Sequence, residues 1–199
     1  MAIEIELKAR LEEIEPVKDR LSQFGVFLNS FEKFDNYWTV EKEGTLFSLR
    51  VRREKTMSGS QVKETVLATY KQKEIIDGME INNEKEFIVS DAGVFEEFLN
   101  CLGMKPEIKK EKRGWAWYIP EASQPPVLAE LLMVKDLGWF IELEILAENR
   151  GREIIDTSRK RLLVLLEKLG IAPEKIEERP YSMMLRNTQN PGILSAGGQ

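Results

Sequence analysis

Apolar and polar residues alternate with a period of two along much of the chain, which is the spacing expected of β-strands with one buried face. This alternation predicts eight strands, at Ala2–Ala9, Phe31–Val40, Leu46–Arg53, Glu64–Lys73, Met79–Val89, Ile108–Tyr118, Val127–Val134 and Gly138–Leu146. Three other segments have apolar residues at helical spacing and predict helices at about Ile14–Phe24, Asp91–Leu102 and Gly151–Leu169. Each ends at a glycine suited to the left-handed position after a helix, namely Gly25, Gly103 and Gly170.

The order of these elements repeats along the chain. A strand with a Glu-x-Glu pattern, a helix and then further strands occur twice, starting at Glu4-x-Glu6 and at Glu84-x-Glu86. Two such halves give an α+β fold, and eight strands are enough to form a mainly antiparallel closed β-barrel, or tunnel, with helices packed outside. We expect one domain over residues 1–186 and a mobile tail over residues 187–199, which has Gly and Pro but no periodicity.

Composition removes several classes of chemistry. The 199-residue chain has no histidine, which excludes Ser-His-Asp triads, Cys-His pairs and HExxH zinc sites. Its single cysteine, Cys101, ends an apolar helical run, where a buried structural thiol is expected. The net charge of −5 argues against DNA binding. No apolar run is long enough to span a membrane and no signal-peptide layout is present, so we expect a cytoplasmic protein without a membrane partner.

The polar faces of the predicted strands carry charges of one sign. Residues two positions apart share a face of a strand, and like-signed pairs at this spacing recur at Glu4/Glu6, Arg50/Arg52, Lys71/Lys73, Glu84/Glu86 and Glu142/Glu144. A solvated sheet face is one interpretation, but such faces ordinarily mix signs because neighbouring like charges repel. The other interpretation is a sheet that curls until its charged faces surround a polar tunnel.

A tunnel of this kind must contain water, ions or a charged ligand, because buried unpaired charges are costly. Four of its carboxylates suit a hard divalent cation, Mg²⁺ or Mn²⁺, bound through oxygen: Glu4, Glu6, Glu142 and Glu144. Its cations suit several phosphate groups in a row: Lys8, Arg50, Arg52, Lys71 and Lys73. A triphosphate bound to a divalent metal ion needs both sets.

Short motifs follow one another along residues 2–146 in a characteristic order. They are Glu4-Ile5-Glu6-Leu7-Lys8 (ExExK), Asp35-Asn36-Tyr37 (DxY), Leu49-Arg50-Val51-Arg52 (LRxR), Thr69-Tyr70-Lys71 (TxK), Glu84-Lys85-Glu86 (ExE) and the LGxFxExE segment from Leu137 to Glu144. Their order resembles the CYTH superfamily, the triphosphate tunnel metalloenzymes, which includes class IV adenylate cyclases, thiamine triphosphatases and inorganic tripolyphosphatases. The segment from Tyr181 to Leu185 is similar to a C-terminal helix of the cyclase-type branch.

The resemblance implies roles for the motif residues. The acidic quartet would hold metal ions, with Glu86 near a second ion, and Asp35, Tyr37 and Glu84 would lie in the same site. The basic residues would clamp phosphate, with Lys8, Arg52 and Lys71 acting in catalysis. The sixth strand leaves two registers open, Lys110-Glu111-Lys112 or one that ends at Arg113, and a slip of one residue reverses the faces. Its phosphate-binding candidates are therefore Lys110, Lys112 and Arg113.

The chain departs from the family pattern at several points. Leu132 stands where an acidic residue is common, with Glu130 the nearest acid on that face, and Asn82 stands where arginine is common. Without histidine, the chain also lacks the His-Phe stretch found ahead of ExExK in bacterial cyclases. This last departure weakens the case for cyclase activity rather than the case for the fold.

These observations predict a Mg²⁺- or Mn²⁺-dependent enzyme that acts on a triphosphate inside the barrel. Attack by water on the terminal phosphorus would release orthophosphate, whereas attack by the ribose 3′-hydroxyl of ATP on the α-phosphorus would give cyclic AMP and pyrophosphate. The candidate substrates are ATP, thiamine triphosphate and tripolyphosphate, and the resemblance is compatible with a homodimer. The alternative is a non-catalytic module that binds nucleotide or polyphosphate.

Overall fold

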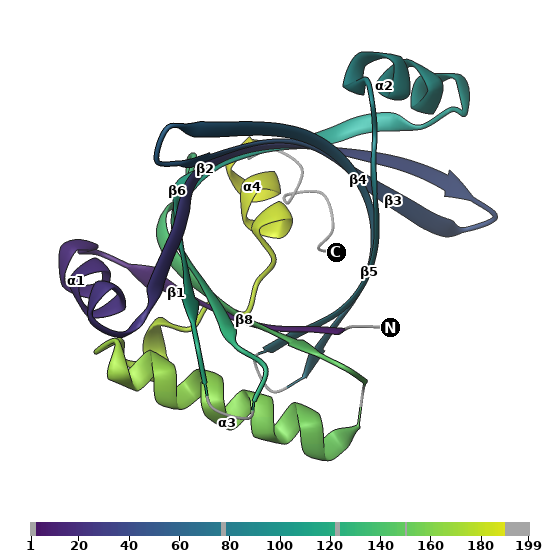
Figure 1. Ribbon diagram of the computed structural model, residues 1–199. Coiled ribbons are helices and arrows are strands. Elements are labelled where there is room, and N and C mark those ends of the chain that lie inside the picture. Colours follow the sequence, from purple (N-terminus) through teal and green to yellow (C-terminus); the bar gives the residue numbers. More distant parts are fainter. Residues whose placement is uncertain (1–2, 77–78, 122–123, 150, 190–199) are drawn as a thin grey trace.

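The computed structural model describes residues 3–76, 79–121, 124–149 and 151–189, and its strands form a closed antiparallel barrel (Figure 1). Around the barrel the strands are hydrogen-bonded in the order β1-β5-β4-β3-β2-β6-β7-β8. Their bounds are β1 Ile3–Leu11, β2 Val26–Lys42, β3 Thr45–Ser58, β4 Gln61–Ile76, β5 Met79–Ile88, β6 Lys105–Ile119, β7 Val127–Val134 and β8 Gly138–Ala147. The fold class predicted from the alternation, and the repeated order of one strand, one helix and three strands, are confirmed.

Three helices pack outside the barrel (Figure 1). Helices α1 (Glu15–Phe24) and α3 (Arg152–Lys168) lie on one side of it, and α2 (Ala92–Cys101) lies on the opposite side. Odd-numbered residues of β1 point toward α3, so that Ile5 and Leu7 are fully buried with Leu143 of β8 and Leu162 of α3. Full burial of one such aliphatic side chain contributes about 1.5–3 kcal/mol, so this core fixes which face of β1 turns outward. The even-numbered, charged residues of β1 consequently face the lumen.

The fourth helix lies inside the barrel. Helix α4 (Tyr181–Gln189) occupies part of the ring of strands (Figure 1), although the sequence predicts helices only on the outside. Its Tyr181 and Met184 are buried against lumen-facing apolar residues of three strands, Phe31 of β2, Leu132 of β7 and Phe140 of β8. The lumen therefore has an apolar part, which α4 covers, and a charged part, which α4 leaves open.

Two expectations about single residues are wrong. Gly25 was expected to be left-handed, as Gly103 and Gly170 are, but its φ is −99° because the chain passes directly from α1 into β2. Space requires a glycine there, since a Cβ atom would lie 2.9 Å from the carbonyl oxygen of Leu21. Cys101 is exposed rather than buried, because α2 packs through Leu99 and turns Cys101 toward solvent.

The C-terminal tail predicted from residue 187 lies largely outside the described residues. Residues 187–189 continue α4, and residues 190–199 are not described. Among the helices of the described ranges, none combines the length and the apolar character needed to cross a membrane.

Candidate active site

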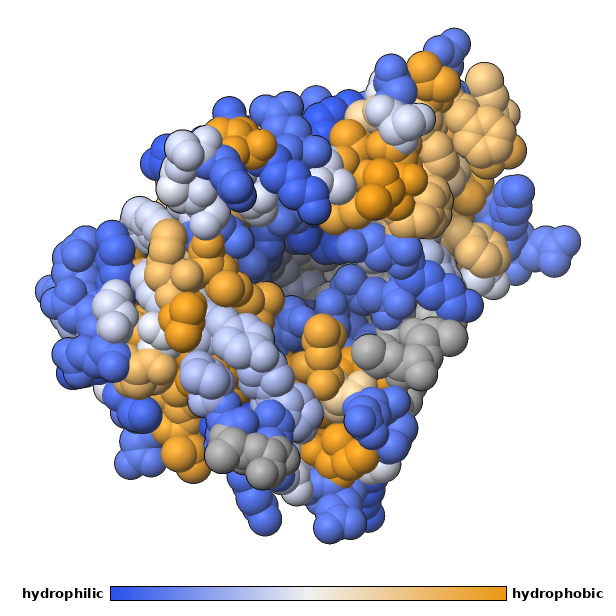
Figure 2. Space-filling model, viewed as in Figure 1, coloured by the Kyte–Doolittle hydropathy of each residue, from blue (hydrophilic) through white to orange (hydrophobic). Residues whose placement is uncertain are grey.

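A cavity of about 360 Å³ occupies the charged part of the barrel lumen. Figure 2 shows the hollow, bordered largely by hydrophilic residues. Its carboxylates are Glu4, Glu6, Glu80, Glu84, Glu107, Glu130, Glu142 and Glu144. Its cations are Lys33, Arg50, Arg52, Lys110, Lys112 and Arg186. The charged faces of the strands thus point at one another around a shared cavity, as the tunnel interpretation predicts, and not at bulk water.

Three lysines in the lumen form buried ion pairs with glutamates. Lys8 Nζ lies 2.5 Å from an oxygen of Glu80, and Lys33 Nζ lies 2.5 Å from an oxygen of Glu130. The third pair joins the ammonium group of Lys112 to both oxygens of Glu142, at 2.7 and 2.9 Å. All six side chains are at most 12% exposed, and unpaired charges at such depth would be strongly destabilising.

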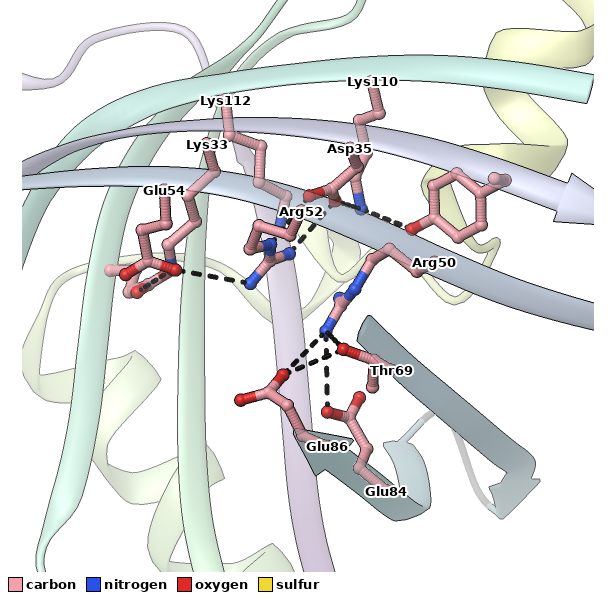
Figure 3. A network of polar contacts seen from close by, with 12 residues as sticks. Lys33, Asp35, Arg50, Arg52, Glu54, Thr69, Glu84, Glu86, Lys110 and Lys112 are labelled. Carbon is pink, nitrogen blue, oxygen red and sulfur yellow. Dashed lines mark hydrogen bonds and ion pairs between the residues drawn. The ribbon is translucent and has the colours of Figure 1, made fainter. Parts of the chain in front are cut away.

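Asp35 anchors one wall of the cavity, although it does not line it. The Arg52 guanidinium donates two hydrogen bonds to its carboxylate, at 2.7 and 3.0 Å, and Lys110 Nζ lies 3.0 Å away (Figure 3). Burial alone would raise the pKa of Asp35, but the charges of Arg52 and Lys110 hold it well below its usual value. Lys110 also donates to the hydroxyl of Tyr37 at 2.8 Å. Asp35 therefore fixes the positions of two cations that do line the cavity.

Arg50 lies beside a second set of acceptors, on β4 and β5. Its Nη2 donates to the Thr69 hydroxyl at 3.0 Å, and this hydroxyl donates to Glu86 at 2.9 Å (Figure 3). The same nitrogen lies 3.7 Å from Glu84 and 3.6 Å from Glu86. Its Nε is buried and has no hydrogen-bond partner among the described residues. Thr69 and the two glutamates thus hold the guanidinium of Arg50 at the wall of the cavity.

Tyr181 brings the inner helix into contact with the charged cluster. The ammonium of Lys112 lies 4.7 Å from the centre of its ring, and those of Lys8 and Lys110 lie at 5.6 Å. The Tyr181 hydroxyl is buried beside the carboxylate of Glu142, with which it interacts. Burial, together with the negative charges of Glu142 and Glu6, raises its pKa well above the usual value. Tyr181 is therefore neutral in the physiological range.

Lys112 and Glu142 stabilise each other's charged forms. Burial alone would lower the pKa of Lys112, but the charges of Glu142 and Glu130 raise it. Burial alone would raise the pKa of Glu142, but the charge and the hydrogen bonds of Lys112 lower it far below the usual value. The pair is fully ionised at neutral pH.

Most of the predicted site residues meet in this lumen. Ten of them line the cavity: Glu4, Glu6, Tyr37, Arg50, Arg52, Glu84, Lys110, Lys112, Glu142 and Glu144. Lys8 and Asp35 lie behind this surface in the ion pairs described above, and Glu86 lies at the edge of the lumen with 39% of its side chain exposed. The side chains of Lys71 and Lys73 lie outside what the structure describes, while the backbone of β4 pairs these positions with Glu84 and Asn82 of β5.

The prediction that Arg113 binds phosphate is wrong. Lys110 and Lys112 are buried in the lumen, so the register of β6 places Arg113 on the outer face of the strand, where it is exposed. It cannot bind a phosphate in the cavity, because neighbouring positions on a strand point to opposite faces. The register Lys110-Glu111-Lys112 is the one that the structure adopts.

Several cavity residues escaped the sequence analysis. Lys33 and Glu80 each continue a charged alternation that was noticed only in part, Lys33-x-Asp35-x-Tyr37 and Glu80-x-Asn82-x-Glu84. Tyr181 and Arg186 belong to α4, whose position inside the barrel no local pattern indicates. Lys33 and Glu80 could have been identified by following the alternation of charged residues along the full length of each strand.

The carboxylates fit a metal ion that is completed by its substrate, rather than a closed metal cage. Within the described ranges, no group of three or more Asp and Glu side chains is arranged to hold a metal ion by itself. Mg²⁺ typically uses one or two carboxylates, waters and substrate phosphates. The carboxylates that β1 and β8 place at the cavity, among them Glu6 and Glu144, which are paired across these strands, match that requirement.

Comparisons with known proteins agree with this geometry. The sequence model of the CYTH domain family matches residues 2–181. No curated protein matches the chain in sequence. The solved structure of the PH1819 protein from Pyrococcus horikoshii is similar, with a TM-score of 0.77 and 24% identity over 93% of this chain and 99% of that one.

Two further solved structures share the fold at lower identity. A candidate adenylate cyclase from Vibrio parahaemolyticus has a TM-score of 0.69 and 17% identity, covering 92% of this chain and 97% of that one. A candidate adenylyl cyclase from Hippeastrum, described as having a dominant triphosphatase activity, has a TM-score of 0.61 and 13% identity over 95% and 96% of the two chains. These likenesses establish the barrel architecture.

Proposed function

The chain belongs to the CYTH domain family, and we propose that it is a divalent-metal-dependent enzyme that hydrolyses a triphosphate inside its barrel. The observation that carries the proposal is the cavity of the barrel lumen, in which arrays of carboxylates and of cations face each other. A metal-bound triphosphate is a ligand that needs both arrays at once.

Cations from several strands would bind the phosphate oxygens. Arg50 and Arg52 of β3 offer planar guanidinium groups that suit bidentate contacts, and Lys110 and Lys112 offer point charges from β6, on the other side of β2. Charge that gathers on the phosphate oxygens during transfer would be stabilised by these fixed cations. Asp35 would act as a positioning residue, since it holds Arg52 and Lys110 without lining the cavity.

Carboxylates on β1 and β8 would hold the metal ion. Glu4, Glu6, Glu142 and Glu144 all line the cavity, and oxygen donors are the preferred ligands of Mg²⁺ and Mn²⁺. When bound, such an ion would neutralise phosphate charge and lower the pKa of a coordinated water.

The chemistry of the cavity wall favours hydrolysis over cyclisation. Cyclisation requires the ribose 3′-hydroxyl to reach the α-phosphorus, so the nucleoside must also be held in the site. Among the described lining residues, only Tyr37 and Tyr181 carry aromatic rings, and three lysines surround the ring of Tyr181. A wall that consists mainly of charged groups suits the phosphate chain better than a nucleobase. Water attack on the terminal phosphorus would then give orthophosphate.

Incubation with three substrates tests the proposal. Purified protein is mixed with tripolyphosphate, thiamine triphosphate or ATP, each with Mg²⁺ or Mn²⁺, and the products are identified by ³¹P NMR. We expect orthophosphate from at least one of the three and no cyclic AMP. Cyclic AMP and pyrophosphate from ATP would establish the cyclase reaction instead, and binding of all three substrates without turnover would establish a non-catalytic module.

A further inference from the structure

Two of the buried ion pairs form a single quartet of charges. Lys33 and Lys112 are direct cross-strand neighbours on β2 and β6, and Glu130 and Glu142 are direct cross-strand neighbours on β7 and β8. Each lysine is bound to one of the glutamates, at 2.5 Å for Lys33–Glu130 and 2.7 Å for Lys112–Glu142. All four residues line the cavity. The quartet thus consists of two adjacent ammonium groups that neutralise two adjacent carboxylates.

Either ligand alone would bind at the expense of a buried ion pair. A divalent cation that took Glu142 would leave the Lys112 ammonium without its partner at 7% exposure, and a phosphate that took Lys112 would leave the Glu142 carboxylate next to a like charge. Removal of one partner from a buried pair is strongly unfavourable, because the remaining charge stays desolvated. When both ligands arrive, each member of the pair receives a new partner of opposite charge.

Each lysine of the quartet also lies close to an aromatic ring. Lys33 Nζ lies 4.3 Å from the centre of the Phe31 ring, and Lys112 Nζ lies 4.7 Å from that of Tyr181. The face of an aromatic ring attracts a cation. The ammonium groups therefore keep one favourable contact when the carboxylates turn away, and they remain directed at the cavity.

We propose that this quartet couples metal binding to polyphosphate binding: Lys33 and Lys112 pass from Glu130 and Glu142 to phosphate oxygens while the two carboxylates pass to the metal ion. The inference rests on the proposed function, because it assumes that the cavity takes a metal ion and a polyphosphate. Coupling between two ligands is reciprocal, and typical couplings change an affinity by about 5- to 150-fold. The metal ion alone is bound weakly because the lysines occupy its carboxylate ligands. The polyphosphate alone is bound weakly because the glutamates occupy the ammonium groups that would bind it.

The coupling is tested by titrating one ligand at a time into variants in which one charged side chain of the quartet is replaced by an uncharged one. These binding measurements do not depend on catalysis. Lys112→Met frees Glu142, so its affinity for Mn²⁺ alone, measured by calorimetry, should rise about tenfold. Glu142→Gln frees Lys112, so its affinity for tripolyphosphate in the presence of EDTA should also rise about tenfold. Lys33→Met and Glu130→Gln provide an independent second pair, and circular dichroism establishes that each variant is folded before it is titrated.

Matched controls separate the quartet from general electrostatics. Lys110→Met removes a lumen cation that is bound to Asp35 and Tyr37 and not to a member of the quartet, so it should raise the affinity for Mn²⁺ far less. Lys135→Met and Glu111→Gln disrupt an exposed pair with a 2.8 Å separation outside the cavity and should change neither affinity.

The outcomes distinguish the inference from the proposed function. An increase in the affinity for Mn²⁺ alone or for tripolyphosphate alone that occurs only in the quartet variants would support the coupling. Wild-type protein that binds Mn²⁺ alone and tripolyphosphate alone as tightly as the variants would overturn the coupling while leaving the triphosphate site intact. Wild-type protein that fails to bind tripolyphosphate even with Mn²⁺ present would overturn both.

Discussion

Asp35 illustrates how one buried carboxylate organises many charges. Its side chain is fully buried and contacts both Arg52 and Lys110, so two cations of the cavity depend on it for their position. The sequence placed Asp35 in the site through a three-residue motif, but the motif could not show that its role is to hold other residues. That role depends on partners that are distant along the chain, on β3 and β6.

Replacement of Asp35 by asparagine should destabilise the barrel strongly. Asp35→Asn leaves the Arg52 and Lys110 charges buried without their common partner, and loss of one partner from a buried pair costs about 3–5 kcal/mol. Since the pKa of Asp35 lies below its unfolded value of 3.8, its contribution is complete above that pH and is lost as the pH falls through the folded pKa.

Chemical denaturation from pH 7 down to pH 3 checks this prediction. The stability gap between wild type and Asp35→Asn should be widest at neutral pH and should narrow in the acid range. Glu12→Gln is the control, because Glu12 is an exposed carboxylate paired with Lys175, and we expect no measurable change from it. A gap that stays constant with pH would show that the Asp35 charge is not the cause.

The position of helix α4 inside the barrel is the feature of the fold that the local sequence pattern indicates least. Its sequence suggests an ordinary C-terminal helix, whereas the structure places it inside the barrel, anchored by chain segments that precede it. Glu177, just before α4, accepts hydrogen bonds from Arg10 at 2.9 Å and from Arg179 at 2.7 Å, and its backbone N–H donates to the carbonyl of Lys8. Hydrogen bonds from Arg179 and Arg10 lower the pKa of Glu177 to about 2. These contacts fix the segment before α4 against β1, from where the chain enters the lumen.

The ring of Tyr181, rather than its hydroxyl, should hold α4 in place. Tyr181→Ala should lower the free energy of unfolding by about 3 kcal/mol, since it removes a buried ring that packs edge-on against Phe140. Tyr181→Phe keeps this packing and removes only the hydroxyl beside Glu142, so stability should change by about 1 kcal/mol or less. Urea denaturation of both variants checks the difference. Equal losses in the two would mean that the hydroxyl is the anchor.

At the scale of the whole molecule, the sequence indicated the barrel and the inward direction of its charges. Period-two alternation is a local property, so it could be recognised strand by strand, and the recurrence of like-signed pairs on five strands made solvent exposure a poor explanation. The ion-pair partners could not be predicted in the same way. Lys33 and Glu130 are 97 residues apart in the chain, and only closure of the barrel brings them together. Arg113 shows how strongly such a prediction depends on the register, because a slip of one residue turns a side chain to the opposite face of the sheet.

Arg50 and Arg53 allow a direct test of whether the inward charges form the site of triphosphate hydrolysis. Both lie on β3, but Arg50 lines the cavity, whereas Arg53 pairs with Glu96 of α2 on the outer face. The measurement is kcat of wild type, Arg50→Met and Arg53→Met on the triphosphate that the wild type hydrolyses fastest. We predict that Arg50→Met lowers kcat about 100-fold or more, as expected for loss of a fixed group that stabilises transition-state charge, and that Arg53→Met leaves it unchanged. Equal kcat values for the two variants would show that the cavity is not the site of hydrolysis.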